Sequence, residues 1–156
     1  MIDNFNNGHW NDRASSLQVN GPCQWILFQH WYYDGLSFVV GPGTTDYEIR
    51  FGLTAVRCLP ADNTNNMILF KRDEYRGTEI LVLSTSTSDL RNDSFNDDVS
   101  SLIITGGTWQ LYSETNYQGS SITLGPGHYP TASSLYPIAN DDLSSVRLLG
   151  EIIKFM

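Results

Sequence analysis

The chain has 156 residues, of which 40% are hydrophobic and 12% aromatic, so it can bury a packed core and is not intrinsically disordered. Its 17 acidic and 9 basic residues give a net charge of -8, which argues against nucleic-acid and anionic-membrane partners because both require a positive surface. The acidic balance is compatible with a cation partner, and it is also what an ordinary soluble acidic protein shows.

Short apolar and aromatic runs, separated by Gly and Pro clusters, recur along the chain, and helical periodicity is nearly absent. Runs of this length and spacing are typical of a β-sandwich. The sequence therefore predicts an all-β protein with strands over residues 26–28, 37–40, 67–70, 79–83, 102–105, 109–112, 121–124 and 146–149.

The chain contains an internal repeat. In three segments an aromatic residue ends an apolar run, a second aromatic follows, and a Gly lies seven positions after the first: Phe28 to Gly35, Phe70 to Gly77 and Tyr112 to Gly119. Two copies continue into a Gly-Pro-Gly, at 41–43 and 125–127. Its recurrence at one offset, with no Lys-Ser/Thr after it, indicates a turn rather than a phosphate loop.

Each repeat closes with a polar loop followed by a strand. The loops at 96–101 and 140–145 read Asn-Asp-Asp-Val-Ser-Ser and Asn-Asp-Asp-Leu-Ser-Ser. Their counterparts in the first half are 50–55 (Arg-Phe-Gly-Leu-Thr-Ala) and 11–16 (Asn-Asp-Arg-Ala-Ser-Ser), and the latter lacks the front half of its repeat. This organisation predicts an incomplete domain over 1–59, a linker over 60–65, a complete domain over 66–150 and a strand-like tail over 151–156. An incomplete sheet leaves an open edge, so we hypothesise that the tail pairs with the first domain.

An aromatic residue, six intervening residues, a Gly and a late Ser, within about 40 residues, resemble the Greek-key motif of the βγ-crystallin superfamily. The resemblance covers nearly the whole chain and is strong over 109–119, Trp-Gln-Leu-Tyr-Ser-Glu-Thr-Asn-Tyr-Gln-Gly. In that family two motifs pair into one sandwich, and an Asn/Asp-Asn/Asp-x-x-Ser/Thr-Ser loop marks the calcium-binding members. The resemblance therefore implies two Greek-key sandwich domains, with calcium ions (Ca2+) bound by the second.

The resemblance also implies that the two loops of a domain exchange calcium ligands. One site would combine the Asp98 carbonyl, the Ser100 hydroxyl, the Asp141 carboxylate and the hairpin carbonyl of Asp73. Its partner would combine the Asp142 carbonyl, the Ser144 hydroxyl, the Asp97 carboxylate and the hairpin carbonyl of Thr115. Calcium takes six to eight such oxygen ligands, and one or two direct carboxylates per site predict an affinity on the order of micromolar to sub-millimolar.

The residues themselves point to a cation as well. If the paired motifs bring the four carboxylates of Asp97, Asp98, Asp141 and Asp142 together, the like charges repel, and a divalent cation removes that cost.

The first domain departs from this pattern. Arg13 takes the carbonyl-donating position of its loop, and Phe51 replaces the acidic residue that would cross over. A half-site could combine the carbonyls of Trp31 and Gly52, the Thr54 hydroxyl and the Asp12 carboxylate. We expect weak binding or none there.

No apolar run approaches the roughly 20 residues of a membrane helix, and the polar start of the chain differs from a signal peptide. Cys23 and Cys58 are the only cysteines and lack metal or redox spacing. We expect a cytoplasmic protein with two partly buried thiols, and a single bridge between them is the alternative.

The sequence thus predicts a non-enzymatic calcium-binding protein in which calcium stabilises the second domain, and the first domain pairs with it inside a monomer. One alternative is a purely structural protein with vestigial loops, because Asn-Asp and Ser-Ser also form Asx-type turns. Another is a carbohydrate-binding module that uses the tryptophans, Trp10, Trp25, Trp31 and Trp109.

Overall fold

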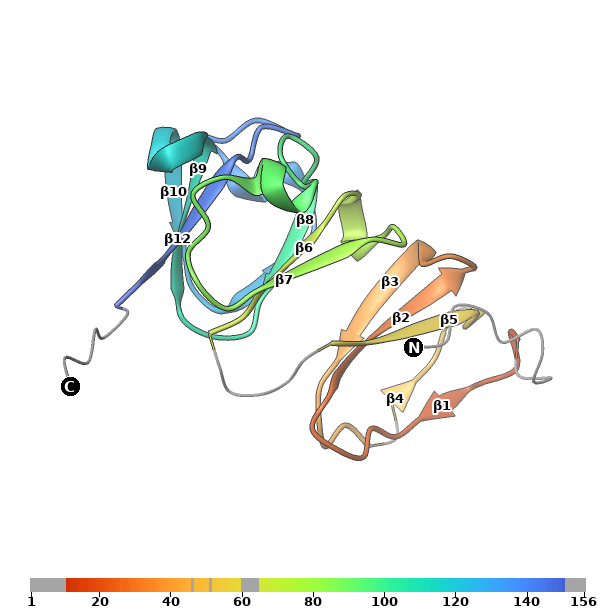
Figure 1. The fold of residues 1–156 in the computed structure, drawn as a ribbon. Coiled ribbons are helices and arrows are strands. Elements are labelled where there is room, and N and C mark those ends of the chain that lie inside the picture. The colour runs from red at the N-terminus through yellow and green to blue at the C-terminus, as the bar shows by residue number, and fades with distance from the viewer. Residues whose placement is uncertain (1–10, 46, 51, 60–64, 151–156) are drawn as a thin grey trace. The chain divides into compact units, whose positions relative to one another are not determined.

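The structure is a computed structural model that describes residues 11–45, 47–50, 52–59 and 65–150. Antiparallel strands make up most of its regular structure, which confirms the all-β prediction (Figure 1). The chain divides into two compact units, Met1–Asp62 with Glu74–Thr78, and Asn63–Asp73 with Glu79–Met156. The predicted linker over 60–65 lies mostly, and the tail over 151–156 entirely, outside the described residues. Within the described ranges, no helix has the length and apolar character needed to span a membrane.

The strands of the second unit are, in chain order, β6 (Met67–Phe70), β7 (Ile80–Leu83), β8 (Ser101–Ile104), β9 (Thr108–Glu114), β10 (Gln118–Leu124), β11 (Gly127–Tyr129) and β12 (Ser145–Leu149). They form one sheet in the order β11-β8-β6-β7 and another in the order β10-β9-β12. Each repeat also contributes to the other repeat's sheet, since β11 pairs with β8, and Thr87 bridges Val146 of β12. The two repeats therefore fold as one interlocked sandwich.

Short 3-10 turns connect these strands. They are η2 (Asp73–Tyr75), η3 (Leu90–Asp93), η4 (Thr115–Tyr117) and η5 (Ala132–Leu135).

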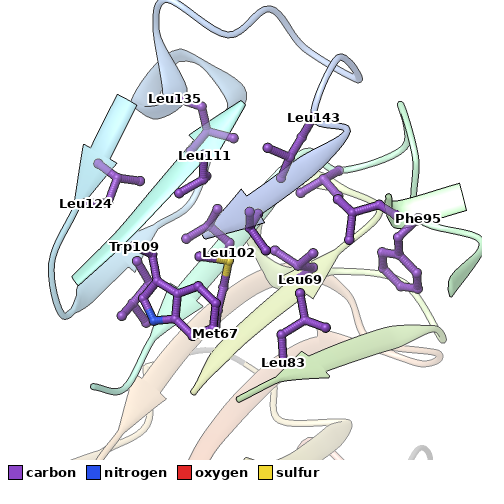
Figure 2. Close-up of a cluster of buried hydrophobic side chains, with 14 of the residues drawn as sticks. Met67, Leu69, Leu83, Phe95, Leu102, Trp109, Leu111, Leu124, Leu135 and Leu143 are labelled. Atoms are coloured by element: carbon purple, nitrogen blue, oxygen red, sulfur yellow. The ribbon is translucent and has the colours of Figure 1, made fainter. Parts of the chain in front are cut away.

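The core of the second unit lies between the inner faces of its two sheets. Alternation along β9 turns Trp109 and Leu111 inward, into one cluster with Met67 and Leu69 of β6 (Figure 2). The Trp109 side chain is fully buried, and its indole Nε1 donates to the Gly106 carbonyl at 3.1 Å. Burying one large apolar side chain contributes roughly 1.5–3 kcal/mol, so this cluster is the main source of the unit's stability.

The repeated aromatic and glycine positions close a folded hairpin in each unit. The rings of Tyr112 and Tyr117 meet edge to face with centroids 5.8 Å apart, as do those of Phe28 and Tyr33 at 5.3 Å. Two positions after Tyr117, Gly119 has a φ of 79°, and a Cβ there would collide with the Ser113 hydroxyl. The spacing seen in the sequence therefore reflects ring packing followed by a left-handed residue.

The strands of the first unit are β1 (Ser16–Leu17), β2 (Gln24–His30), β3 (Asp34–Val40), β4 (Tyr47–Glu48) and β5 (Ala55–Leu59). They form a sheet in the order β3-β2-β5 and a smaller β1-β4 sheet. By position in the repeat, β1 and β4 correspond to β8 and β11, and the larger sheet corresponds to β10-β9-β12. The described residues of this unit contain no counterparts of β6 and β7. The prediction of a sandwich lacking part of its first motif is therefore confirmed.

A disulfide joins Cys23, next to β2, to Cys58 of β5, with the two Cα atoms 5.8 Å apart. The expectation of two thiols is therefore wrong, and the alternative of a single bridge is right. Cys23 directly precedes β2, and Cys58 lies on β5, the antiparallel neighbour of β2, a closeness that sequence spacing could not reveal. The cytoplasmic location stays a prediction, but it loses the support of reduced cysteines.

Loss of this bridge should destabilise the first unit. The cysteines are 35 residues apart, and closing a loop of that length stabilises a fold by about 4 kcal/mol in the chain-entropy description. Calorimetry of a Cys23→Ser/Cys58→Ser variant should show a lower melting transition for the first unit only. Reductant should lower the melting transition of the first unit in the unmodified protein to a similar extent, and it should not change the melting of the variant. An unmoved transition in both experiments would contradict the prediction.

Candidate metal centre

Each Asn-Asp-Asp-x-Ser-Ser loop of the second unit orients its first aspartate in the same way. Asp97 and Asp141 have left-handed backbones, with φ of 52° and 56°, a conformation that Asp tolerates better than most residues. The side-chain amide of the preceding residue, Asn96 or Asn140, donates to Oδ2 of that aspartate. This contact leaves Oδ1 turned toward the other loop.

The two loops then hold each other reciprocally. The Ser100 hydroxyl donates to Oδ1 of Asp141, and the Ser144 hydroxyl donates to Oδ1 of Asp97, at 3.1 Å in both cases. A backbone hydrogen bond of 3.1 Å from Asp97 to the Leu143 carbonyl supports the same crossing. The structure thus pairs the hydroxyl and carboxylate that the resemblance assigns to each candidate site.

The sheets fix the positions of the two serines. The backbone amide of Ser100 donates to the Phe70 carbonyl, and the backbone amide of Ser144 donates to the Tyr112 carbonyl, at 3.0 Å in both cases. These bonds anchor one loop to the end of β6 and the other to β9, and both serine side chains are buried.

The second serine of each loop tethers a hairpin. The hydroxyl of Ser101 donates to the Arg72 carbonyl, and that of Ser145 donates to the Glu114 carbonyl at 2.6 Å. Asp73 begins η2 and Thr115 begins η4, one residue beyond these two carbonyls. Both predicted hairpin ligands therefore lie in segments that are bonded to the loop of their own site.

The Asp98 carboxylate forms an ion pair with Lys71. Its ammonium lies 2.8 Å from Glu79 and 2.9 Å from Asp98, and these hydrogen bonds, to Glu79 first, raise the pKa of Lys71. The lysine remains a cation at neutral pH and holds the Asp98 carboxylate. This arrangement agrees with the assignment of the Asp98 carbonyl, rather than its carboxylate, as a ligand. Asp142, the equivalent residue of the other loop, is exposed.

The spacing of the paired oxygens suits calcium. Calcium–oxygen bonds of 2.3–2.6 Å place two ligands that are 3.1 Å apart at an angle of roughly 73–85° about the ion. Neighbouring ligands of a pentagonal bipyramid subtend about 72–90°, so each pair could occupy adjacent positions. Ser100 Oγ is also 3.1 Å from the Lys71 carbonyl, which can accept the hydroxyl proton while the oxygen faces a cation. The donors present therefore fit calcium.

The expected gathering of four carboxylates is not found. Among the residues that the structure describes, no group of three or more His, Cys, Asp or Glu side chains could hold a metal ion. Asp97 and Asp141 face opposite serines, and Asp98 pairs with Lys71. The case for calcium rests on mixed oxygen donors and no longer on mutual repulsion of carboxylates.

The first unit reproduces half of this arrangement. The Thr54 hydroxyl donates to Oδ1 of Asp12 at 3.3 Å, and the Asp12 amide donates to the Leu53 carbonyl at 3.2 Å. A hollow of about 540 Å³ is lined in part by Trp31 and Gly52, so all four residues of the predicted half-site surround one space. Phe51 lies outside the described residues.

Sequence reasoning missed several residues that build the site. It did not assign Asn96 and Asn140 as orienting groups, or Ser101 and Ser145 as tethers to the hairpins. Repetition of the whole Asn-Asp-Asp-x-Ser-Ser string was the available signal. Nothing in the sequence indicated the pairing of Lys71 with Asp98, because 27 positions separate them.

Comparison with known proteins agrees with the fold. The family model described as Beta/Gamma crystallin matches residues 66–149. A beta/gamma-crystallin of Ciona intestinalis is 43% identical over 81 residues, which cover 52% of this chain and 94% of that protein. Gamma-crystallin D of Homo sapiens is 29% identical over 122 residues, which cover 75% of this chain and 69% of that protein.

Solved structures extend the similarity to both units. Geodin, a beta-gamma crystallin from Geodia cydonium, matches with a TM-score of 0.66 and 25% identity, covering 86% of this chain and 89% of that one. A beta gamma crystallin from Ciona intestinalis matches with a TM-score of 0.50, covering 53% of this chain and 98% of that one. This chain belongs to the beta/gamma crystallin family.

Adding a methyl group at Gly52 should disrupt the Thr54–Asp12 contact. A Cβ at this position would collide with the Asp12 carboxylate. We expect Gly52→Ala to lower the free energy of unfolding of the first unit by about 1–3 kcal/mol, measured by urea denaturation. Gly41→Ala is the matched control, because nothing lies within 4 Å of its Cβ position. Equal effects of the two substitutions would contradict the prediction.

Proposed function

We propose that this chain is a non-enzymatic calcium-binding protein and that two calcium ions stabilise its second unit. The observation that carries the proposal is the reciprocal pairing of Ser100 with Asp141 and of Ser144 with Asp97. Family membership supports it, because the two loops match the pattern that marks calcium-binding members of the superfamily.

The two sites have equivalent ligand sets. Each takes a carboxylate oxygen from one loop, and a hydroxyl and a carbonyl from the other loop. A fourth ligand is a hairpin carbonyl. The first set is Asp141, Ser100, Asp98 and Asp73, and the second is Asp97, Ser144, Asp142 and Thr115. Calcium would supply two positive charges that attract these oxygens together, in place of a single hydrogen bond.

Binding of this kind stabilises the folded state selectively. The paired residues of the two sites are 41 and 47 positions apart, so an unfolded chain does not hold them together. Free calcium at 100 times the dissociation constant would raise the free energy of unfolding by about 2.7 kcal/mol per site. A single direct carboxylate per site keeps the expected affinity modest.

The two alternatives differ in what supports them. A purely structural protein would keep the same loops as turns, and their hydrogen bonds serve that role without an ion. A carbohydrate-binding platform could not include all four tryptophans, because Trp109 is fully buried in the core of the second unit. The monomeric state and the pairing of the two domains stay predictions.

Calcium should raise one melting transition, and two substitutions should abolish the rise. We expect calorimetry in excess calcium and in chelator to differ for the second unit of the unmodified protein, and to coincide for Asp97→Ala/Asp141→Ala. A control variant, Asp93→Ala/Glu48→Ala, removes the same charge from other exposed positions and should keep the response. Identical melts of the unmodified protein in both conditions would mean that the loops are structural turns only.

Single substitutions should separate the two sites. Asp97→Ala removes the carboxylate from the site of Ser144 and leaves the site of Ser100 intact. Isothermal titration should then give one ion per chain in place of two, and Asp141→Ala should do the same. Ser100→Ala and Ser144→Ala test the hydroxyls without changing charge, and each should weaken one site. Loss of both ions from either aspartate variant would contradict the exchange of ligands between loops.

A further inference from the structure

The hollow of about 540 Å³ in the first unit has a lining that suits an organic ligand. Sites for small molecules typically measure about 300–1,000 Å³, whereas calcium holds its ligands at about 2.3–2.6 Å and needs far less space. The lining residues with side chains offer a carboxylate, two amides, a hydroxyl, an imidazole and an indole, and they are Asp12, Asn11, Gln29, Thr54, His30 and Trp31.

The hollow lies at positions equivalent to a proposed calcium site of the second unit. By position in the repeat, Trp31 and Gly52 correspond to Thr115 and Asp142, two of the proposed ligands of the site of Ser144. Those two ligands are backbone carbonyls, so the side chains at their positions are free to differ. The difference between the two units therefore lies in the side chains that surround the site.

Gln29 carries a donor that its position in the hairpin does not require. Its Oε1 accepts from the backbone amide of Leu36 at 3.4 Å, and in the second unit the Ser113 hydroxyl accepts from the backbone amide of Ser120 at 2.9 Å. A serine is therefore enough for this bond. Within the described part of the chain, Nε2 of Gln29 has no hydrogen-bond partner, so it can donate to a ligand in the hollow.

His30 is held in place against Gly35. A Cβ at Gly35 would lie 2.6 Å from Cδ2 of the imidazole, as a Cβ at Gly119 would lie 2.9 Å from Cγ of Glu114 in the second unit. The two side chains thus take the same packing position, but a neutral imidazole both donates and accepts where the second unit has a carboxylate. Among the residues that the structure describes, the imidazole of His30 has no hydrogen-bond partner.

Trp31 and Asp12 complete the lining. Trp31 is 44% exposed, and covering its indole with a ligand removes apolar surface from water. The Asp12 carboxylate is oriented by the Thr54 hydroxyl at 3.3 Å and by the side-chain amide of Asn11 at 2.9 Å, and it can accept further hydrogen bonds. An apolar surface therefore borders a set of oriented polar groups.

The mixture of donors and acceptors selects the class of ligand. A hydroxyl both donates and accepts, so a ring of hydroxyls can bond an amide, an imidazole and a carboxylate together. A cationic ligand offers donors only and would leave the Gln29 amide unmatched. An anion would face Asp12 and a chain with a net charge of -8.

We propose that this hollow binds a neutral saccharide. Trp31 packs against the apolar C–H face of the sugar ring, and Gln29, His30 and Asp12 form hydrogen bonds with its hydroxyls. The binding is separate from the calcium sites of the second unit and requires no metal ion.

Saturation-transfer NMR of the full chain in chelator tests the proposal with a panel of hexoses, N-acetylhexosamines, pentoses and their short neutral oligomers. We expect at least one of these sugars to bind, and Trp31→Ala to lower its affinity at least roughly ten-fold. Tyr136→Ala is the control, because this aromatic of the second unit is 80% exposed, and its affinity should be unchanged. The proposal would be overturned if no sugar bound at millimolar concentration, if Trp31→Ala had no greater effect than the control, or if binding required calcium.

A second variant tests the polar groups without disturbing the fold. Gln29→Ser/His30→Glu introduces the residues that the second unit has at the equivalent positions, Ser113 and Glu114, and these keep the hairpin bond and the packing against glycine. We expect saccharide affinity to fall at least roughly ten-fold while the melting transition of the first unit stays in place. Saccharide binding of unchanged affinity by this variant would overturn the proposal.

Discussion

Two loops that are far apart in sequence hold each other in the second unit, each through a buried serine hydroxyl and the aspartate of the other. This reciprocal contact lies where the two repeats cross, and three further sets of bonds converge on it. Asparagine amides orient the carboxylates, carbonyls of β6 and β9 hold the serine amides, and the adjacent serines hold the hairpins. The interlocked sheets and the candidate ion sites therefore share the same set of contacts.

The first unit shows that this contact does not require the full set of calcium ligands. Thr54 and Asp12 reproduce the hydroxyl–carboxylate pair and its backbone support, although Arg13 and Gly52 replace the second aspartates of the two loops. The close approach of Asp12 to Gly52 depends on the missing Cβ. Serving as a turn and serving as a metal ligand are thus separable properties of one loop. This separation is why a structural role remains the alternative for the second unit, and why the single-site variants are decisive.

The two units stabilise their sandwiches by different means. The second fills its core with side chains from both sheets and from the turn before its first loop. The first has smaller sheets and a disulfide that joins Cys23, just before β2, to Cys58 of β5. A small sandwich buries little apolar surface, so a covalent link has a greater effect on its stability.

Much of the fold could be predicted because repetition is visible without coordinates. All eight predicted stretches overlap strands, although Glu79 and Thr105 lie just outside them, and aromatic–glycine spacing identified the hairpins because ring packing and left-handed glycines recur at fixed offsets. The strands missed were β1, β4 and β11, which have two or three residues, and β5, whose apolar run is interrupted by Arg57. Pairing with distant partners, rather than local pattern, makes such short segments strands.

The sequence by itself determined the class of fold and the two loops, since both follow from residue types at repeated offsets, whereas the eight candidate ligands follow from the resemblance of these loops to the family's pattern. Only the tertiary structure decided which atoms meet. It brought Cys23 to Cys58, Lys71 to Asp98, and each serine to the aspartate of the opposite loop. It also separated carboxylates that local sequence had suggested would cluster. These outcomes depend on where strands distant in sequence come to lie side by side. The number of residues between two positions in the sequence does not fix their distance in the folded protein.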